Sequence, residues 1–229
     1  MPQNGIHAIV GVVSRKWMPN KEWLLLGVVL GNMFPDLDNV VVAYATLFKH
    51  MTTEQAAEIY HRTFTHSIFT IIVLVALFYL ASAVTKNMTW RNFGQGFGAG
   101  ILMHMLLDLV IWFNGVELFW PIRYELNFWG WFVVPAWLKI FLDTGEFLAF
   151  GLYCLYLGSL ARQYKTDTDS LSLLSVFAYV ELGLFVLFTV LFFVSTKGIY
   201  HTIFGALYLL SMFYAIGVTF RVRRTLEKV

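Results

Sequence analysis

The sequence is poor in charge, since only 13% of its 229 residues are Asp, Glu, Lys or Arg. A soluble domain typically carries about 25% charged residues, so an ordinary water-facing globular protein is excluded. A disordered chain and a coiled coil are excluded as well, because both need far more charge. The formal net charge of +2 is too small for a nucleic-acid-binding surface, and the single cysteine, Cys154, rules out an intrachain disulfide.

The sequence is instead rich in apolar and aromatic residues. Hydrophobic residues make up 59% of the chain, aromatic residues 18%, and the mean hydropathy is +0.68. This composition is typical of side chains that meet lipid and its interface. We therefore predict an all-α fold, a polytopic membrane protein built as a helical bundle.

Apolar runs indicate where the chain crosses the bilayer, because a spanning helix needs roughly 20 mostly apolar residues. Five stretches qualify or come close: 67–85, 94–113, 145–161, 171–195 and 199–220. Residues 22–34 predict a partial or tilted span, which gives about five to six spans in all. Three further stretches predict re-entrant or interfacial helices: 5–14, 39–50 and 131–142.

Few segments remain outside the bilayer. Residues 51–60 predict a short surface helix, because Thr52 and Gln55 have the spacing of a capping box. Residues 114–130, rich in Trp and Phe, predict an interfacial loop. The polar linker 163–170 separates a predicted metal-site bundle (1–162) from a C-terminal helix pair with a basic tail (171–229).

The basic residues predict the orientation of the chain. Most of the 16 Lys and Arg residues lie in four clusters that fall on one side if each predicted span crosses once. The clusters are Arg15, Lys16 and Lys21; Lys86 and Arg91; Arg162 and Lys165; and Arg221, Arg223, Arg224 and Lys228. Because basic loops stay in the cytoplasm, the C-terminus is expected there.

The 94–113 segment carries two ionisable residues within an apolar run, His104 and Asp108. A charge at this depth is costly, at about 2.5–3.5 kcal/mol, so such residues are functional candidates. Their spacing of four places both on one helical face, with Gly100 and Gly96 on the same stripe. The small residues would let another helix backbone approach closely. A structural His–Asp hydrogen bond that seals a helix interface is the alternative.

Other polar motifs border the predicted spans. Asp36 and Asp38 directly follow the first apolar run, where they could also simply cap a helix. His61, Arg62 and His66 precede the 67–85 span. The two histidines are five residues apart and do not share a helical face, so we expect His66 to open the span and His61 to approach from the preceding loop.

The predicted topology gathers these groups on the outer side of the membrane. A divalent cation would offset the repulsion between the carboxylates and use the lone pairs of the imidazoles. The predicted metal ligands are His7, Asp36, Asp38, His61, His66, His104 and Asp108. Mixed His and Asp ligands favour zinc, with manganese or iron as alternatives, over calcium.

Five motifs occur in a defined order: Gly5-Ile6-His7, Pro35-Asp36-Leu37-Asp38, His61-Arg62-x-x-Thr65-His66-Ser67, His104-x-x-x-Asp108 and Glu117-Leu118-Phe119-Trp120-Pro121. Together they resemble the LexA-regulated, predicted membrane-bound metal-dependent hydrolases, over residues 5–122. That family is thought to be similar to zinc-dependent phospholipase C, in which helices present His and Asp to a metal cluster. The resemblance implies phosphoester hydrolysis.

The sequence thus predicts a membrane-embedded hydrolase that binds one or two divalent ions and cleaves a lipid phosphate or another amphiphilic phosphoester. Asp36 or Asp38 would orient or deprotonate a metal-activated water, and Arg62 would hold a phosphate oxygen. Glu117 is a spare candidate ligand. The expected location is the plasma (inner) membrane of a bacterium or archaeon, with membrane lipids and no nucleic acid as partners.

Two other functional classes fit the same residues. Intramembrane Asp and His could form the relay of an ion- or proton-coupled transporter or channel, in which case polar groups should extend toward both faces. The chain could equally be a metal-binding scaffold without turnover. Glu181, in the 171–195 segment, either forms a hydrogen bond within the bundle or marks a second polar path.

Overall fold

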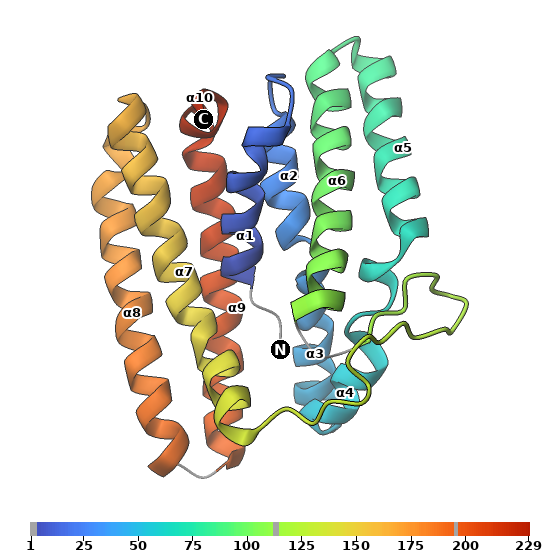
Figure 1. Ribbon diagram of the computed structural model, residues 1–229, viewed down its shortest axis with the longest axis vertical. Coiled ribbons are helices and arrows are strands. Elements are labelled where there is room, and N and C mark those ends of the chain that lie inside the picture. The colour runs from blue at the N-terminus through green and yellow to red at the C-terminus, as the bar shows by residue number, and fades with distance from the viewer. Residues whose placement is uncertain (1–3, 112–114, 195–196) are drawn as a thin grey trace. The chain divides into compact units, whose positions relative to one another are not determined.

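The computed structural model describes residues 4–111, 115–194 and 197–229 (Figure 1). Over these residues the chain is helical, and the only paired extended residues are one isolated bridge between Val116 and Leu126. Six helical segments within the described part are long and apolar enough to cross a membrane. The predicted all-α membrane bundle is therefore confirmed.

Five long helices account for most of these segments: α5 (Ile68–Thr85), α6 (Met88–Ile111), α7 (Ala136–Tyr164), α8 (Leu171–Val194) and α9 (Lys197–Arg221). The last residues of the predicted 94–113 and 171–195 spans, and the first residue of the predicted 114–130 loop, lie outside the described residues. The prediction of a separate short helix at 131–142 is wrong, because α7 begins at Ala136 and continues without a break.

The sixth segment joins two predicted pieces. α2 (Leu24–Met33) continues through the short 3-10 turn η2 (Pro35–Asp38) into α3 (Asn39–Phe48). Together they form a 25-residue apolar stretch, Leu24–Phe48, so the piece at 39–50 extends the partial span. Pro35 lacks a backbone N–H and interrupts the regular helix at this point. The interruption leaves two carboxylates, those of Asp36 and Asp38, in the middle of a stretch that is long enough to span.

The chain folds into two compact units, one of residues 19–133 and the other of residues 1–18 with 134–229. Their boundaries differ from the predicted division at 163–170. In the second unit, α1 (Asn4–Val13) packs against α7, where a Cβ on Gly5 would lie 2.5 Å from the backbone of Ala149. α7, α8 and α9 share an aromatic core around Phe188. The C-terminal helix α10 (Arg223–Lys228) completes this unit.

The unit of residues 19–133 depends on a close approach between α2 and α6. Glycines lie on both helices at their contact: Gly27 and Gly31 on α2, Gly96 and Gly100 on α6. A Cβ on Gly100 would lie 2.7 Å from the backbone nitrogen of Asn32, closer than any side chain tolerates. The predicted small-residue stripe therefore faces another helix backbone, and it brings the C-terminal end of α2 against the His104 turn.

Two further features of this unit frame its polar region. α4 (Thr53–Tyr60) begins with the predicted capping box, because the Thr52 side chain accepts from the Gln55 backbone and the Gln55 side chain accepts from the Thr52 backbone. The loop after α6 is fastened to the start of α5, where the Ser67 hydroxyl donates to the Trp120 carbonyl at 2.8 Å. The loop is thereby held beside the segment that carries His61, Arg62 and His66.

Candidate metal centre

Six of the seven predicted ligands belong to the unit of residues 19–133, and the structure brings them together. They are Asp36, Asp38, His61, His66, His104 and Asp108. Three different local structures supply them: the turn η2, the segment between α4 and α5, and the interior of α6. His7 is buried in α1, which belongs to the other unit, so its contribution to a metal site stays a prediction.

The centre of this group is a pair of imidazoles, those of His66 and His104. Their Nε2 atoms lie 3.2 Å apart, and both side chains are fully buried. His66 lies in the short 3-10 turn η3 (Phe64–His66) just before α5, as the spacing of the two histidines predicted. His104 projects from the middle of α6.

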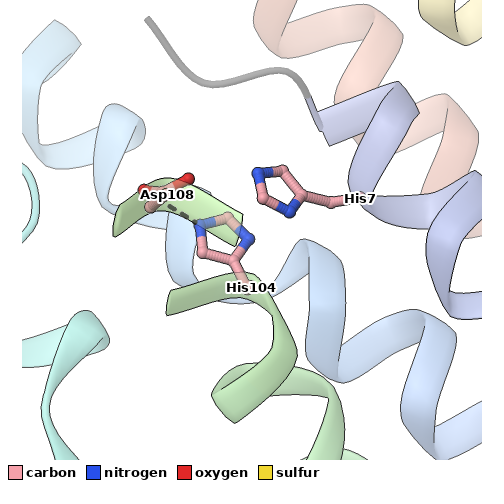
Figure 2. Close-up of side chains that lie close together, drawn as sticks. All are labelled: His7, His104 and Asp108. Carbon is pink, nitrogen blue, oxygen red and sulfur yellow. Dashed lines mark ion pairs between the residues drawn. The ribbon is translucent and has the colours of Figure 1, made fainter. Parts of the chain in front are cut away.

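Two carboxylates border the imidazole pair. Asp108 Oδ2 lies 3.5 Å from His66 Nε2 and 3.6 Å from His104 Nε2. Figure 2 shows His104 and Asp108 on successive turns of α6, with their ion pair drawn as a dashed line. Asp36 Oδ1 lies 3.7 Å from His104 Nε2. In the described part of the chain, neither carboxylate oxygen of the fully buried Asp36 has a hydrogen-bond partner.

The hydrogen bonds of the Nδ1 atoms of His66 and His104 indicate which ring nitrogens carry the protons. His104 Nδ1 lies 2.7 Å from the Asn32 carbonyl, which can only accept, so Nδ1 carries the proton and Nε2 the lone pair. The Thr65 hydroxyl donates to Asp38 at 2.8 Å and is 3.0 Å from His66 Nδ1, which leaves it as an acceptor for that nitrogen. In their neutral forms the two imidazoles therefore direct lone pairs at each other beside two carboxylates.

A positive charge between these lone pairs and anions would stabilise the arrangement. Ligands held tetrahedrally around zinc at about 2.0–2.2 Å lie roughly 3.3–3.6 Å from one another. His66 Nε2, His104 Nε2 and Asp108 Oδ2 lie 3.2 to 3.6 Å from one another, and Asp36 Oδ1 lies 3.7 Å from His104 Nε2. The donor set thus fits a divalent ion in both chemistry and spacing.

Asp38 takes a different position, behind the histidines. Its Oδ1 lies 2.7 Å from His61 Nδ1, and its Oδ2 accepts from the Arg62 backbone N–H at 3.0 Å and from the Thr65 hydroxyl. Carboxylates that fix the tautomer of a ligand histidine are common around metals. Asp36, Asp38 and His61 nevertheless also have ligand atoms within 4.8 Å of one another, so this side of Asp36 could hold a second ion.

His61 and His66, which lie in the segment that precedes α5, have pKa values displaced in opposite directions. Burial lowers the pKa of His61 to about 4, against the raising influence of Asp38. Burial also acts to lower the pKa of His66, but hydrogen bonds with Asp108 and Asp38 outweigh it and raise that pKa above its ordinary value of 6.5. His61 is therefore neutral near pH 7, whereas His66 retains a proton to higher pH, which offsets the charge of the neighbouring carboxylates.

Arg62 contacts one of the candidate metal ligands and also lines a pocket. Its Nε is 3.3 Å from Asp108 Oδ2, and the residue is only 6% exposed. Its φ of 60° lies in the left-handed region, which is strained for a residue with a side chain. The strain is held by two backbone hydrogen bonds, from Arg62 N–H to Asp38 and from Glu117 N–H to the Arg62 carbonyl at 3.3 Å.

The pocket has a volume of about 360 Å³ and lies in the same unit as the ligands. His61 and Arg62 line it from one segment, and Glu117 and Glu125 from the loop after α6. Glu117, predicted as a spare ligand, is thus at the pocket and outside the groups of ligand atoms found among the described residues. Any molecule that enters this pocket meets the imidazole and guanidinium next to the candidate metal centre.

Two functional contacts escaped the sequence prediction, those of Asn32 and Thr65. Asn32 acts through its backbone carbonyl, which no side-chain pattern reveals. Thr65 lies inside the His61–Ser67 motif, and its position next to His66 was the available signal. Each of these residues contacts a candidate ligand histidine through a ring nitrogen.

Comparison with known families places the chain among membrane proteins. A family model described as "YdjM inner membrane protein" matches residues 4–167, and the chain therefore belongs to that family. No curated protein and no solved structure matches the chain. The matched range includes every predicted ligand.

Proposed function

We propose that this member of the YdjM inner membrane protein family is a metal-dependent hydrolase that cleaves a phosphoester of a lipid or another amphiphilic substrate. The observation that carries the proposal is the buried contact between the Nε2 atoms of His66 and His104, beside the unpartnered carboxylate of Asp36. His66, His104, Asp36 and Asp108 would hold one divalent ion, zinc by preference. Asp36, Asp38 and His61 would hold a second ion if one binds.

A divalent ion at these ligands would supply Lewis acidity, activating a water molecule and offsetting negative charge on the phosphate. The residues of the chain provide the rest of the chemistry. His61 is held by Asp38 through Nδ1, which leaves the lone pair on Nε2 to accept the proton of the attacking water. The three donors on Asp38 favour a supporting role for that carboxylate over the base role that the sequence had suggested.

The environment of Arg62 favours a phosphoester as the substrate. Among the residues that the structure describes, its buried Nη2 has no hydrogen-bond partner, while its Nε pairs with Asp108. A guanidinium in this state would bind a phosphate oxygen at the pocket and shift negative charge away from the reacting phosphorus.

The surroundings of the pocket favour an amphiphilic substrate. The loop that supplies Glu117 and Glu125 also exposes large aromatic side chains: Phe119, Trp120, Phe128 and Trp131. Exposed Trp and Phe at the end of a membrane helix are typical of the headgroup level of a bilayer. A lipid could therefore present its phosphate to the pocket while its chains stay in the membrane.

For the orientation we propose a cytoplasmic C-terminus and a site toward the outer side of a bacterial or archaeal inner membrane. The support is the basic tail around Arg223 and Arg224 and the other basic clusters of the sequence. Fusions of a periplasmic reporter enzyme and of a cytoplasmic fluorescent reporter to the C-terminus test this. Activity of the periplasmic reporter would contradict the proposal.

The proposed reaction is tested with detergent-purified protein and a panel of phosphodiester and phospholipid substrates, with added zinc or manganese. The wild type is expected to release product, and Asp36→Asn and His104→Ala to lose at least a hundredfold in rate. His50→Asn is the matched control, since His50 is exposed and belongs to none of the groups of candidate ligand atoms among the described residues. Full activity after metal removal would refute the proposal, whereas bound metal without turnover of any substrate would support a scaffold.

A further inference from the structure

We infer that the pocket beside the metal centre selects phosphoesters that carry a cationic amine a few atoms from the phosphate. The inference rests on the proposed function, because it assigns a substrate class to the same site. It is carried by the side chains that line the pocket, which separate into a cationic base and an anionic rim.

The rim of the pocket is formed by three carboxylates from different parts of the unit. Glu58 comes from α4, while Glu117 and Glu125 come from the loop after α6. These glutamates line a space of only about 360 Å³. Their shared negative charge would repel an anionic ligand that brought no positive group with it.

The base of the pocket holds the positively charged guanidinium of Arg62 beside the neutral His61 and carries the second, independent observation. Arg62 and His61 line it, and within the described residues the buried Arg62 Nη2 and His61 Nε2 have no hydrogen-bond partners. Buried polar groups without partners are rare in folded proteins and point to a missing ligand. A phosphate oxygen is the acceptor that suits the guanidinium.

The loop after α6 holds the acidic rim of the pocket next to its base. The Glu117 backbone N–H donates to the Arg62 carbonyl at 3.3 Å, so the segments carrying the anionic and cationic groups are directly joined. Glu125 lies against Gly115, where a Cβ would collide with its carboxylate. The Asn127 amide donates to Glu125 Oε1 at 3.5 Å. Gly115 thus provides the space that Glu125 occupies at the pocket.

A ligand with both charges satisfies both ends at once. Its phosphate would meet Arg62 and the metal centre, and its ammonium group would meet the glutamates. An ester of similar size without the amine would place its anionic phosphate near three carboxylates with nothing to compensate them. The chemical class is therefore an aminoalkyl phosphate, either as a lipid headgroup or as a water-soluble ester.

The test compares phosphoethanolamine with propyl phosphate, which has nearly the same shape but a methyl group in place of the amine. Binding to metal-loaded, detergent-purified protein is measured by calorimetry. We expect phosphoethanolamine to bind at least tenfold more tightly, and the double variant Glu117→Gln/Glu125→Gln to abolish this preference with its metal content unchanged. Equal binding of the two esters to the wild type, tighter binding of propyl phosphate, or binding of neither would overturn the inference.

Further experiments distinguish a lipid headgroup from a soluble ester as the ligand. They also distinguish failure of the selectivity from failure of the proposed hydrolase reaction. Mixed micelles that contain phosphatidylethanolamine or phosphatidylglycerol show whether a lipid headgroup is preferred over the soluble ester. If the double variant does not fold, Glu58→Gln on the exposed face of α4 replaces it, with a reduced preference expected. Selective binding without turnover would contradict the hydrolase and leave the selectivity standing, and turnover without selectivity would do the reverse.

Discussion

Substitution of Gly100 by alanine tests whether the contact between α2 and α6 holds the metal ligands in place. A Cβ at this position would lie 2.7 Å from the Asn32 backbone nitrogen and 2.9 Å from the Gly31 carbonyl carbon. Both neighbours are backbone atoms, so no side chain can rotate to make room. The two helices must move apart locally.

The size of the movement follows from ordinary contact distances. A carbon atom rests at about 3.5 Å from a neighbouring heavy atom, and the Val28 carbonyl oxygen of α2 lies still closer to the added Cβ than Asn32 does, so α2 would retreat from Gly100→Ala by at least roughly 0.8 Å. The His104 Nδ1 to Asn32 carbonyl hydrogen bond, now 2.7 Å, would then stretch to the limit of a real hydrogen bond. Loss of such an orienting contact reduces metal affinity about 10–100-fold, and overpacking destabilises the fold by about 1–3 kcal/mol.

The assay is zinc affinity by competition with a chelating dye, together with the thermal unfolding midpoint of the detergent-solubilised protein. Gly183→Ala on α8 is the matched control, because a Cβ there would meet no heavy atom within 4 Å among the described residues. We expect the control to keep both values and Gly100→Ala to lower both. Unchanged zinc affinity in Gly100→Ala would refute the link between helix packing and the ligand geometry.

Three further outcomes follow from the site. Asp38→Asn should weaken zinc binding about 10–100-fold without abolishing it, because Asp38 orients His61 and His66. Complete loss of zinc binding in the same competition assay would instead make Asp38 a direct ligand. Zinc affinity should fall about tenfold per pH unit below the raised pKa of His66, because zinc must displace one proton from that imidazole. His61, with its pKa near 4, stays neutral down to about pH 5 and adds no further dependence. A zinc affinity that does not change between pH 5 and 7 would contradict this. Arg62→Lys should raise the KM for a phosphoester with little change in zinc content, because lysine lacks the forked guanidinium. A loss of zinc as large as the loss of activity would assign Arg62 to the metal site.

The sequence predicted the elements that depend on local patterns. Long, mostly apolar runs predicted the helices α5, α6, α8 and α9, and the spacing of four placed His104 and Asp108 on one face of α6. The Gly96 and Gly100 stripe indicated a close helix contact, which α2 provides. These features need no knowledge of distant residues.

The parts that the sequence missed depend on contacts between distant segments or on backbone atoms. The Asn32 carbonyl that orients His104 lies 72 residues away and has no side-chain signature. Asp38 looked like a ligand or base, and its three donors become visible only when the His61–Thr65 segment folds over it. The acidic rim likewise requires the loop after α6 to return to α4 and Arg62.

The central claim is that a divalent cation binds between the buried imidazoles of His66 and His104. The most direct measurement is the metal content of protein purified without added metal or chelator, by elemental analysis of the wild type and of His66→Ala and His104→Ala. The account predicts at least one divalent ion per wild-type chain and almost none in either variant. Metal-free wild-type protein that cannot be loaded, or variants that retain the full metal content, would contradict it.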